Sequence, residues 1–277
     1  MHILFFLTAC VSIFAVVLIC VFLFANGIPA IGKIGPLNFL GGAVWKPSNN
    51  LFGILPMILG SIYVTAGAII IGVPIGIFMA VFMARFCPGS LYKILKPAVE
   101  LLAGIPSIVY GFFGMEVLVP LLRNTFAAFN CKGNSMLAAS ILLGIMILPT
   151  IIGVSESAIR AVPNSYYEGS LALGADHERS VFFAVLPAAK SGILAGVVLG
   201  IGRAIGETMA VIMVAGNQPA MAHSIFKGVR TMTANVVIEM GYATGIHREA
   251  LIATGVVLFV FILLINLLFS VIKRREK

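Results

Sequence analysis

Charged residues are scarce in this sequence. Asp, Glu, Lys and Arg together make up 10% of its 277 residues, whereas about a quarter is usual in soluble domains. Hydrophobic residues make up 60%, and they come in blocks of about 20, the length at which a helix crosses a bilayer. The sequence therefore predicts an all-α integral membrane protein, in which lipid replaces much of the core of a soluble protein.

Motifs for several kinds of chemistry are also missing. The sequence has no G-x-x-x-x-G-K-[ST] run, so we expect the chain to bind no ATP or other cofactor itself. Its four cysteines and four histidines show no disulfide or metal-ligand spacing. The lack of G-x-S-x-G and H-E-x-x-H motifs disfavours an intramembrane hydrolase. The net charge of +8 comes from basic residues scattered over loops, which excludes a nucleic-acid site. We expect a non-catalytic membrane subunit.

Six hydrophobic segments are long enough to span a membrane. They lie roughly at residues 3–25, 56–84, 97–122, 136–155, 185–215 and 251–272. The third contains LAGIPSIVYGFFG, whose glycines and proline predict a broken helix that faces protein or a cavity. We divide the chain into a first helix with its following loop (1–55), a five-helix domain (56–272) and a basic tail (273–277).

The basic residues predict the orientation. Placing both termini in the cytoplasm puts ten of the 18 lysines and arginines inside, including Lys273, Arg274 and Arg275, seven outside, and one, Arg203, within the membrane. Most of those seven fall in long loops, which constrain orientation weakly. In this orientation the only tryptophan, Trp45, suits the outer membrane interface. Residues 217–250 are too polar to span and too apolar for a free loop, so they predict a short surface-lying or re-entrant helical segment.

The loop at residues 156–180 faces the cytoplasm in this orientation. Pro163 suits the first turn of a helix, Gly174 its end, and Asp176 the N-cap of the next helix. The sequence thus predicts a short helix, Asn164 to Leu173, and a sharp turn. The helix would have an apolar side made of Tyr166, Tyr167, Leu171 and Leu173. A membrane-surface helix and a docking helix both fit these residues.

Arg203 and Glu207 lie deep in the fifth segment. Ionisable groups at membrane depth indicate function, and a spacing of four predicts an ion pair on one helix face. Small residues form one stripe at Gly192, Gly196, Gly200, Ala204 and Thr208, and another at Gly202, Gly206 and Ala210, which predicts close packing on several sides. The pair would either serve an oxyanion pathway, because a guanidinium fork suits such anions, or lock two helices together. Thr208 would join the pathway or bond back to its own helix.

The cytoplasmic loop resembles the EAA loop of ATP-binding-cassette import permeases, E-A-A-x3-G-x9-I-x-L-P. The match is carried by Glu168, Gly174, Leu186 and Pro187, with Gly169, Ser170 and Ala184 in place of the two alanines and the isoleucine. The resemblance implies a six-helix type I ABC-importer permease bundle. It also implies that Glu168 to Gly174 form a coupling helix that seats on a separate ATPase subunit.

Three further runs resemble phosphate-importer permeases of the PstC/PstA family, in particular the PstC type. They are LLAGIPSIVYGFFG (101–114), GRAIGETMAV (202–211) and VRTMTANVVIEMG (229–241). The resemblance implies a permease subunit of an ATP-driven, binding-protein-dependent importer of inorganic phosphate, in the cytoplasmic membrane of a bacterium or archaeon, with Arg203 and Glu207 on the phosphate pathway.

The resemblance also implies partners. These are a second permease subunit, two ATPase subunits that hydrolyse ATP, an extracytoplasmic phosphate-binding protein and membrane lipid. Two alternatives remain at this point. One is an ABC permease for another oxyanion, sulfate or molybdate, and the other is an ion-gradient-driven secondary transporter, a class that often shows inverted repeats.

Overall fold

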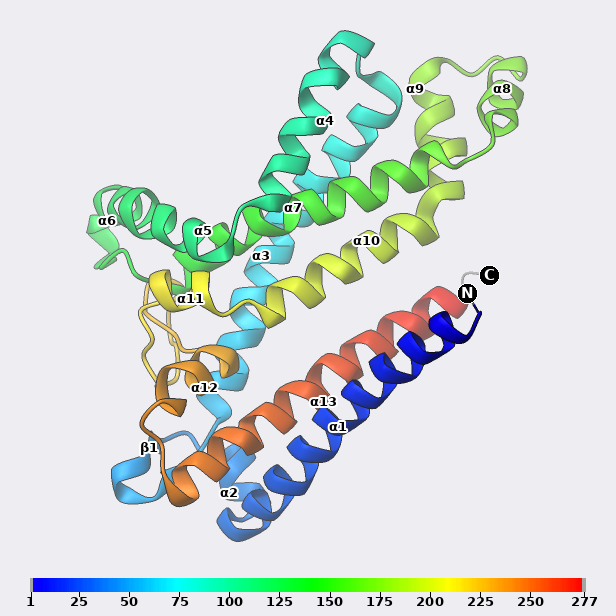
Figure 1. The fold of residues 1–277 in the computed structure, drawn as a ribbon. Helices are drawn as coiled ribbons and strands as arrows, with labels where there is room; N and C mark the ends of the chain where they lie inside the picture. The colour runs from blue at the N-terminus through cyan, green and yellow to red at the C-terminus, as the bar shows by residue number, and fades with distance from the viewer. Residues whose placement is uncertain (1, 276–277) are drawn as a thin grey trace.

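The computed structural model describes residues 2–275, which form helices and one two-stranded hairpin (Figure 1). In chain order the elements are α1 (His2–Ile34), α2 (Pro36–Gly41), β1 (Trp45–Lys46), β2 (Leu51–Phe52), α3 (Leu55–Val81), α4 (Gly89–Gly104), α5 (Ser107–Phe113), α6 (Val119–Thr125), α7 (Met136–Arg160), α8 (Asn164–Ala172), α9 (His177–Ser180), α10 (Leu186–Gly206), α11 (Met209–Val214), α12 (Met232–Met240) and α13 (Gly245–Arg275). Part of the predicted basic tail, residues 276–277, lies outside the described residues.

Five helices among the described residues are long and apolar enough to cross a membrane. They are Leu4–Ile34, Leu55–Phe86, Met136–Arg160, His177–Gly206 and Gly245–Leu268. A sixth crossing is possible as a bent pair, Gly89–Gly104 with Ser107–Thr125, whose axes differ by 97°. The predicted break in the third segment is therefore confirmed. Ile105 has an extended backbone there, because the ring of Pro106 disfavours the helical conformation in the residue before it.

The α7 helix is the centre of the bundle and lies between α3 and α10 (Figure 1). Glycines on both neighbours make this possible. A Cβ atom added to Gly76 of α3 would stand 2.8 Å from Ile151 of α7, and one added to Gly200 of α10 would stand 2.9 Å from the same side chain. Ile151 is fully buried between them. The close packing predicted for the stripe at Gly192, Gly196 and Gly200 is confirmed.

The first and last helices form an antiparallel pair beside this centre (Figure 1). The rings of Phe24 and Phe259 lie 5.8 Å apart, and Lys33 and Glu249 form an ion pair of 2.7 Å at the far end. The start of α1 and the end of α13 therefore lie on the same side of the bundle as α8 (Figure 1). The prediction that the first helix ends near residue 25 is wrong. Helix α1 continues to Ile34, and Gly27 lets it pack closely on Val256 of α13.

The opposite end of the bundle is covered by α2, the hairpin and α12 (Figure 1). Trp45 is buried at this end and packs edge-on against Phe52; its place at a membrane interface stays a prediction. The short helix predicted within residues 217–250 is α12. It is not surface-lying, because Met232, Ala234 and Asn235 are fully buried against the bundle.

Candidate functional site

The predicted turn between the fourth and fifth segments is confirmed in detail. Helix α8 spans Asn164–Ala172 and follows Pro163, which is its N-cap residue and not part of its first turn. Gly174 has a φ of +88°, a left-handed conformation that favours glycine. Asp176 caps α9, because its carboxylate accepts a 2.7 Å hydrogen bond from the backbone N–H of Arg179.

Helix α8 stands away from the body of the bundle, and none of its side chains is buried. Leu173 is 91% exposed and Tyr166 54%. Tyr167 anchors the helix, since its hydroxyl lies 2.7 Å from Nδ1 of His177 in α9. The matched motif residues divide between the two sides of the turn: Glu168 and Gly169 are exposed on α8, Ser170 is half-buried, and Leu186 and Pro187 begin α10.

The predicted ion pair between Arg203 and Glu207 is wrong. Helix α10 ends at Gly206, and Glu207 has an extended backbone with φ −69° and ψ 133°, so the two side chains do not share a helix face. The ion pairs of the described residues do not include this one. The Glu207 carboxylate instead accepts hydrogen bonds from the backbone N–H groups of Thr208 (3.1 Å) and Ala210 (3.2 Å). It therefore caps the start of α11.

Thr208 lies in the same break. Its hydroxyl donates to the carbonyl of Gly206 at 3.2 Å, which is the bond back to its own helix that we considered as the alternative to a pathway role. The predicted fifth span, residues 185–215, is thus two helices with an interruption at residues 207–208. The sequence held one signal, because glycine is a poor helix former and threonine is preferred at helix N-caps, the position that Thr208 takes for α11.

Arg203 is half-buried in the last turn of α10, and its Nη1 donates to Oγ1 of Thr150 on α7 at 3.3 Å. In the part of the chain that the structure describes, this neutral hydroxyl is its only hydrogen-bond partner. The α11 helix that follows Arg203 packs on α5, where the hydroxyl of Tyr110 donates to the carbonyl of Leu102, just before the bend between α4 and α5. The guanidinium is therefore held without a carboxylate, close to two broken helices.

One side of α10 beside Arg203 is open. A Cβ atom added to Gly202 or Gly206 would find no atom within 4 Å, so the predicted close packing of this second stripe is wrong for these two residues. Helices α5 and α11 are nevertheless closely packed against each other, since a Cβ on Gly111 of α5 would lie 2.6 Å from the sulfur of Met213 in α11. The two interrupted helices thus meet near an accessible face, as is typical of transporter pathways.

Two buried carboxylates that the sequence analysis did not single out hold the ends of the bundle. Glu156 of α7 accepts hydrogen bonds from Tyr92 (2.7 Å), Lys96 (2.9 Å) and Arg160 (2.8 Å). It was missed because residues 156–180 were predicted to be a loop, whereas α7 continues to Arg160. Its ligands tie α4 to the last turn of α7, directly before α8.

The second carboxylate, Glu239 of α12, lies at the opposite end. It pairs with Arg230, and its Oε2 accepts from Nε1 of Trp45 and contacts Nε2 of His247, both at 2.8 Å. Only the fold brings these residues together, since Trp45 and Glu239 are 194 positions apart in the sequence. This network explains why Trp45 is buried.

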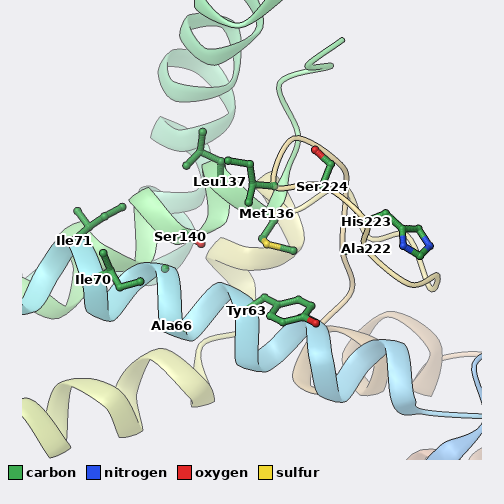
Figure 2. Close-up of a pocket in the computed structure, with 12 residues that line it drawn as sticks. Tyr63, Ala66, Ile70, Ile71, Met136, Leu137, Ser140, Ala222, His223 and Ser224 are labelled. Atoms are coloured by element: carbon green, nitrogen blue, oxygen red, sulfur yellow. The ribbon is translucent and has the colours of Figure 1, made fainter. Parts of the chain in front are cut away.

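A cavity of about 520 Å³ lies away from all these groups, between α3, the start of α7 and residues 222–225 (Figure 2). Its lining is apolar, with Ile70, Ile71 and Met136 on its walls and His223 on the loop. None of the predicted site residues lines it. The chemistry near Arg203 is therefore a property of the helix breaks and not of this cavity.

The family described as "Binding-protein-dependent transport system inner membrane component" matches residues 72–277. The chain belongs to this family. It is therefore a permease, a membrane component of a transport system that works with a binding protein. Membership removes the ion-gradient-driven secondary transporter as an alternative.

The relatives of this permease agree with that conclusion. A Bacillus subtilis protein named "Probable ABC transporter permease protein YqgH" is 40% identical, and the match covers 95% of this chain and 88% of the relative. A Mesorhizobium japonicum protein named "Phosphate transport system permease protein PstC" is 35% identical, with 89% and 81% covered. A protein from Methanocaldococcus jannaschii, named as a probable PstC, is 33% identical, with 91% and 86% covered.

Solved structures show the fold of this permease. A chain of the MetNI methionine ABC transporter, in an inward-facing conformation, is 20% identical with a TM-score of 0.65, and the match covers 84% of this chain and all of that one. A chain of a bacterial alginate-importing ABC transporter is 14% identical with a TM-score of 0.59, with 99% of each chain covered. The predicted type I ABC-importer permease bundle is confirmed.

Proposed function

We propose that this chain is the permease subunit of an ATP-driven importer of inorganic phosphate, and that Arg203 lies on the phosphate pathway. The proposal rests on the surroundings of the Arg203 side chain. Its guanidinium lies within a membrane-spanning segment, is bound by a neutral hydroxyl, and has no ion-pair partner among the described residues. Support for phosphate comes from relatives that are named phosphate transport permeases.

The physical reasoning starts from the cost of desolvation. Removing a charged group from water costs on the order of several kcal/mol, even after the protein relaxes around it. A phosphate ion that enters the membrane loses favourable hydration in this way, and so does an unpaired guanidinium inside the membrane. Bringing the two together lowers both costs, and the planar fork can donate two parallel hydrogen bonds to one oxyanion. A carboxylate paired with Arg203 would compete with the anion. Here the Glu207 carboxylate is bound instead to the backbone N–H groups of Thr208 and Ala210.

Glu207 and Thr208 have a supporting part in this proposal. They hold the break between α10 and α11 in shape, through the cap on α11 and the bond to the carbonyl of Gly206. The pathway then passes along the open side of α10, next to Gly202 and Gly206.

Coupling to ATP is proposed for α8 and its turn. The exposed Glu168 and Gly169, with Ser170, would contact a separate ATPase subunit, while Gly174, Leu186 and Pro187 join the helix to α10. The assembly would contain a second, PstA-like permease, two PstB-like ATPase subunits and an extracytoplasmic, PstS-like phosphate-binding protein. In it this chain would bind no cofactor, catalyse no reaction and keep both termini in the cytoplasm, with residues 56–272 as the permease domain.

The test is uptake of radiolabelled phosphate by the assembled complex in vesicles, divided by the amount of complex recovered with its ATPase. Arg203→Gln should lower uptake roughly tenfold to hundredfold, the loss expected for hydrogen bonds to a charged group. Arg203→Lys should retain an intermediate rate, because the charge stays and the fork is lost. Glu207→Gln is the matched control, and it should transport well because an amide oxygen can accept the same two N–H bonds.

Phosphate uptake by Arg203→Gln at the wild-type rate would contradict the pathway role. Sulfate and molybdate should be measured in parallel. If the wild-type complex carried one of these and not phosphate, the substrate would be the other oxyanion.

A further inference from the structure

Thr150 is a residue of the central helix to which the sequence analysis assigned no function. It directly follows Pro149 in α7 and is half-buried, and its Oγ1 accepts the hydrogen bond from Nη1 of Arg203. The close approach of α7 and α10 brings the two together. Gly196 and Gly200 of α10 lie against Val154 and Ile151 of α7 in an antiparallel register, which places Arg203, the next residue on this side of α10, beside Thr150.

The hydrogen bond leaves both partners able to bind more. A guanidinium has five N–H donors, so four remain when one is given to Thr150. A threonine hydroxyl has one hydrogen of its own to donate. Elsewhere in these helices such a hydrogen returns to the preceding turn, as Thr254 donates to the carbonyl of Ala250 at 2.9 Å. Among the described residues, the Thr150 hydroxyl makes no such bond as a donor; its one hydrogen bond is the one that it accepts from Arg203.

The hydroxyl also differs from a carboxylate in what it does to the charge. It fixes the position of the Arg203 side chain without neutralising it, so an arriving anion does not have to displace an ion pair. The side of α10 at Gly202 and Gly206 is open for that anion. Donors on two different helices would then converge on one oxyanion.

We propose that Thr150 is the second oxyanion-binding residue of the pathway: it orients the Arg203 fork through its oxygen and donates its own hydroxyl hydrogen to the anion in transit. The inference rests on the proposed pathway role of Arg203 and extends it from α10 to α7. The ligand class is a tetrahedral oxyanion, which offers acceptors to both residues at once.

The experiment compares Thr150→Val, which keeps the shape and removes the hydroxyl, with Thr150→Ser, which keeps the hydroxyl. Both are measured in the assembled complex with its ATPase and binding protein. Maximal phosphate uptake per complex should fall roughly tenfold in Thr150→Val, because a donor to a charged group is lost, and stay within about twofold of wild type in Thr150→Ser. ATP hydrolysis stimulated by the binding protein should persist in both, since α8 is unchanged.

Two controls keep the test decisive. Thr254→Val removes a spanning-helix hydroxyl that bonds only to its own helix, and it should transport as wild type does. Thr150→Ala gives a smaller replacement if Thr150→Val does not assemble, and it should show the same tenfold loss.

Wild-type uptake in Thr150→Val would overturn the inference while leaving the role of Arg203 intact. An equal loss in Thr150→Ser would also overturn it, because the methyl group and not the hydroxyl would then matter. Failure of the proposed function looks different: the wild-type complex itself would take up no phosphate. The same variants are then measured with sulfate or molybdate, and transport of none of the three anions would overturn both proposals.

Discussion

Gly192 of α10 lies directly against Ala158 of α7, so closely that a Cβ atom on Gly192 would overlap the Cβ of Ala158. The methyl group of alanine has no side-chain torsion that could move it aside, so the two backbones would have to separate. This contact begins the glycine register that, three turns further along α10, sets Arg203 beside Thr150.

We therefore expect Gly192→Ala to destabilise the permease by about 1–3 kcal/mol, the usual cost of overpacking a tight interface. The measurement is the midpoint of thermal unfolding of the purified protein in detergent. Gly153→Ala on α7 is the control, because a Cβ at Gly153 meets no atom within 4 Å. Equal midpoints for the two variants would show that the α7–α10 contact is looser than described.

Gly174 should be required for coupling because of its backbone and not because of its neighbours. Its φ is +88°, and an added Cβ would meet no atom within 4 Å. A left-handed conformation costs L-residues roughly 1–2 kcal/mol, so Gly174→Val should insert normally but transport poorly for the ATP hydrolysed. Gly174→Asn should retain more activity, since asparagine tolerates this conformation. The ratio of phosphate moved to ATP hydrolysed measures the effect, and equal ratios for valine and glycine would refute it.

Glu156 should stabilise the end of the bundle next to α8. Its carboxylate is buried and accepts three hydrogen bonds, two of them from cations. Glu156→Leu should cost about 1.5–3 kcal/mol, the value for hydrogen bonds to charged groups, since solvent around Lys96 and Arg160 screens part of the loss. Glu100→Gln is the control. Glu100 is exposed and forms a long ion pair of 3.8 Å with the same Lys96, so its loss should lower the stability by less than about 1 kcal/mol. Thermal unfolding in detergent compares them, and a Glu156→Leu protein as stable as the control would contradict the prediction.

The orientation can be tested at two exposed leucines at opposite ends of the bundle. Leu37 of α2 is 89% exposed and Leu173 beside α8 is 91% exposed. In a variant without the four native cysteines, Leu37→Cys should react with an impermeant thiol reagent added to intact cells. Leu173→Cys should react only after the cells are opened, because the basic residues favour the α8 end inside. The reverse pattern would place α8 out of reach of any cytoplasmic ATPase.

Features that depend on neighbouring residues were determined by the sequence alone. The six apolar segments, the break at Pro106 and the turn at Pro163, Gly174 and Asp176 each follow from local backbone preferences and short-range capping, so they could be predicted without the fold. The first glycine stripe on α10 also predicted close helix packing, although not which helix lies against it.

The tertiary structure decided which charged groups meet. Arg203 and Glu207 are four residues apart, but the helix ends between them, and the Glu207 carboxylate is used by the N–H groups that this end exposes. The partner of Arg203 is Thr150, 53 positions away, and Glu239 finds Trp45 across 194 positions. Such pairs depend on the register in which whole elements pack, and that register is the sum of many small contacts that no single stretch of sequence contains.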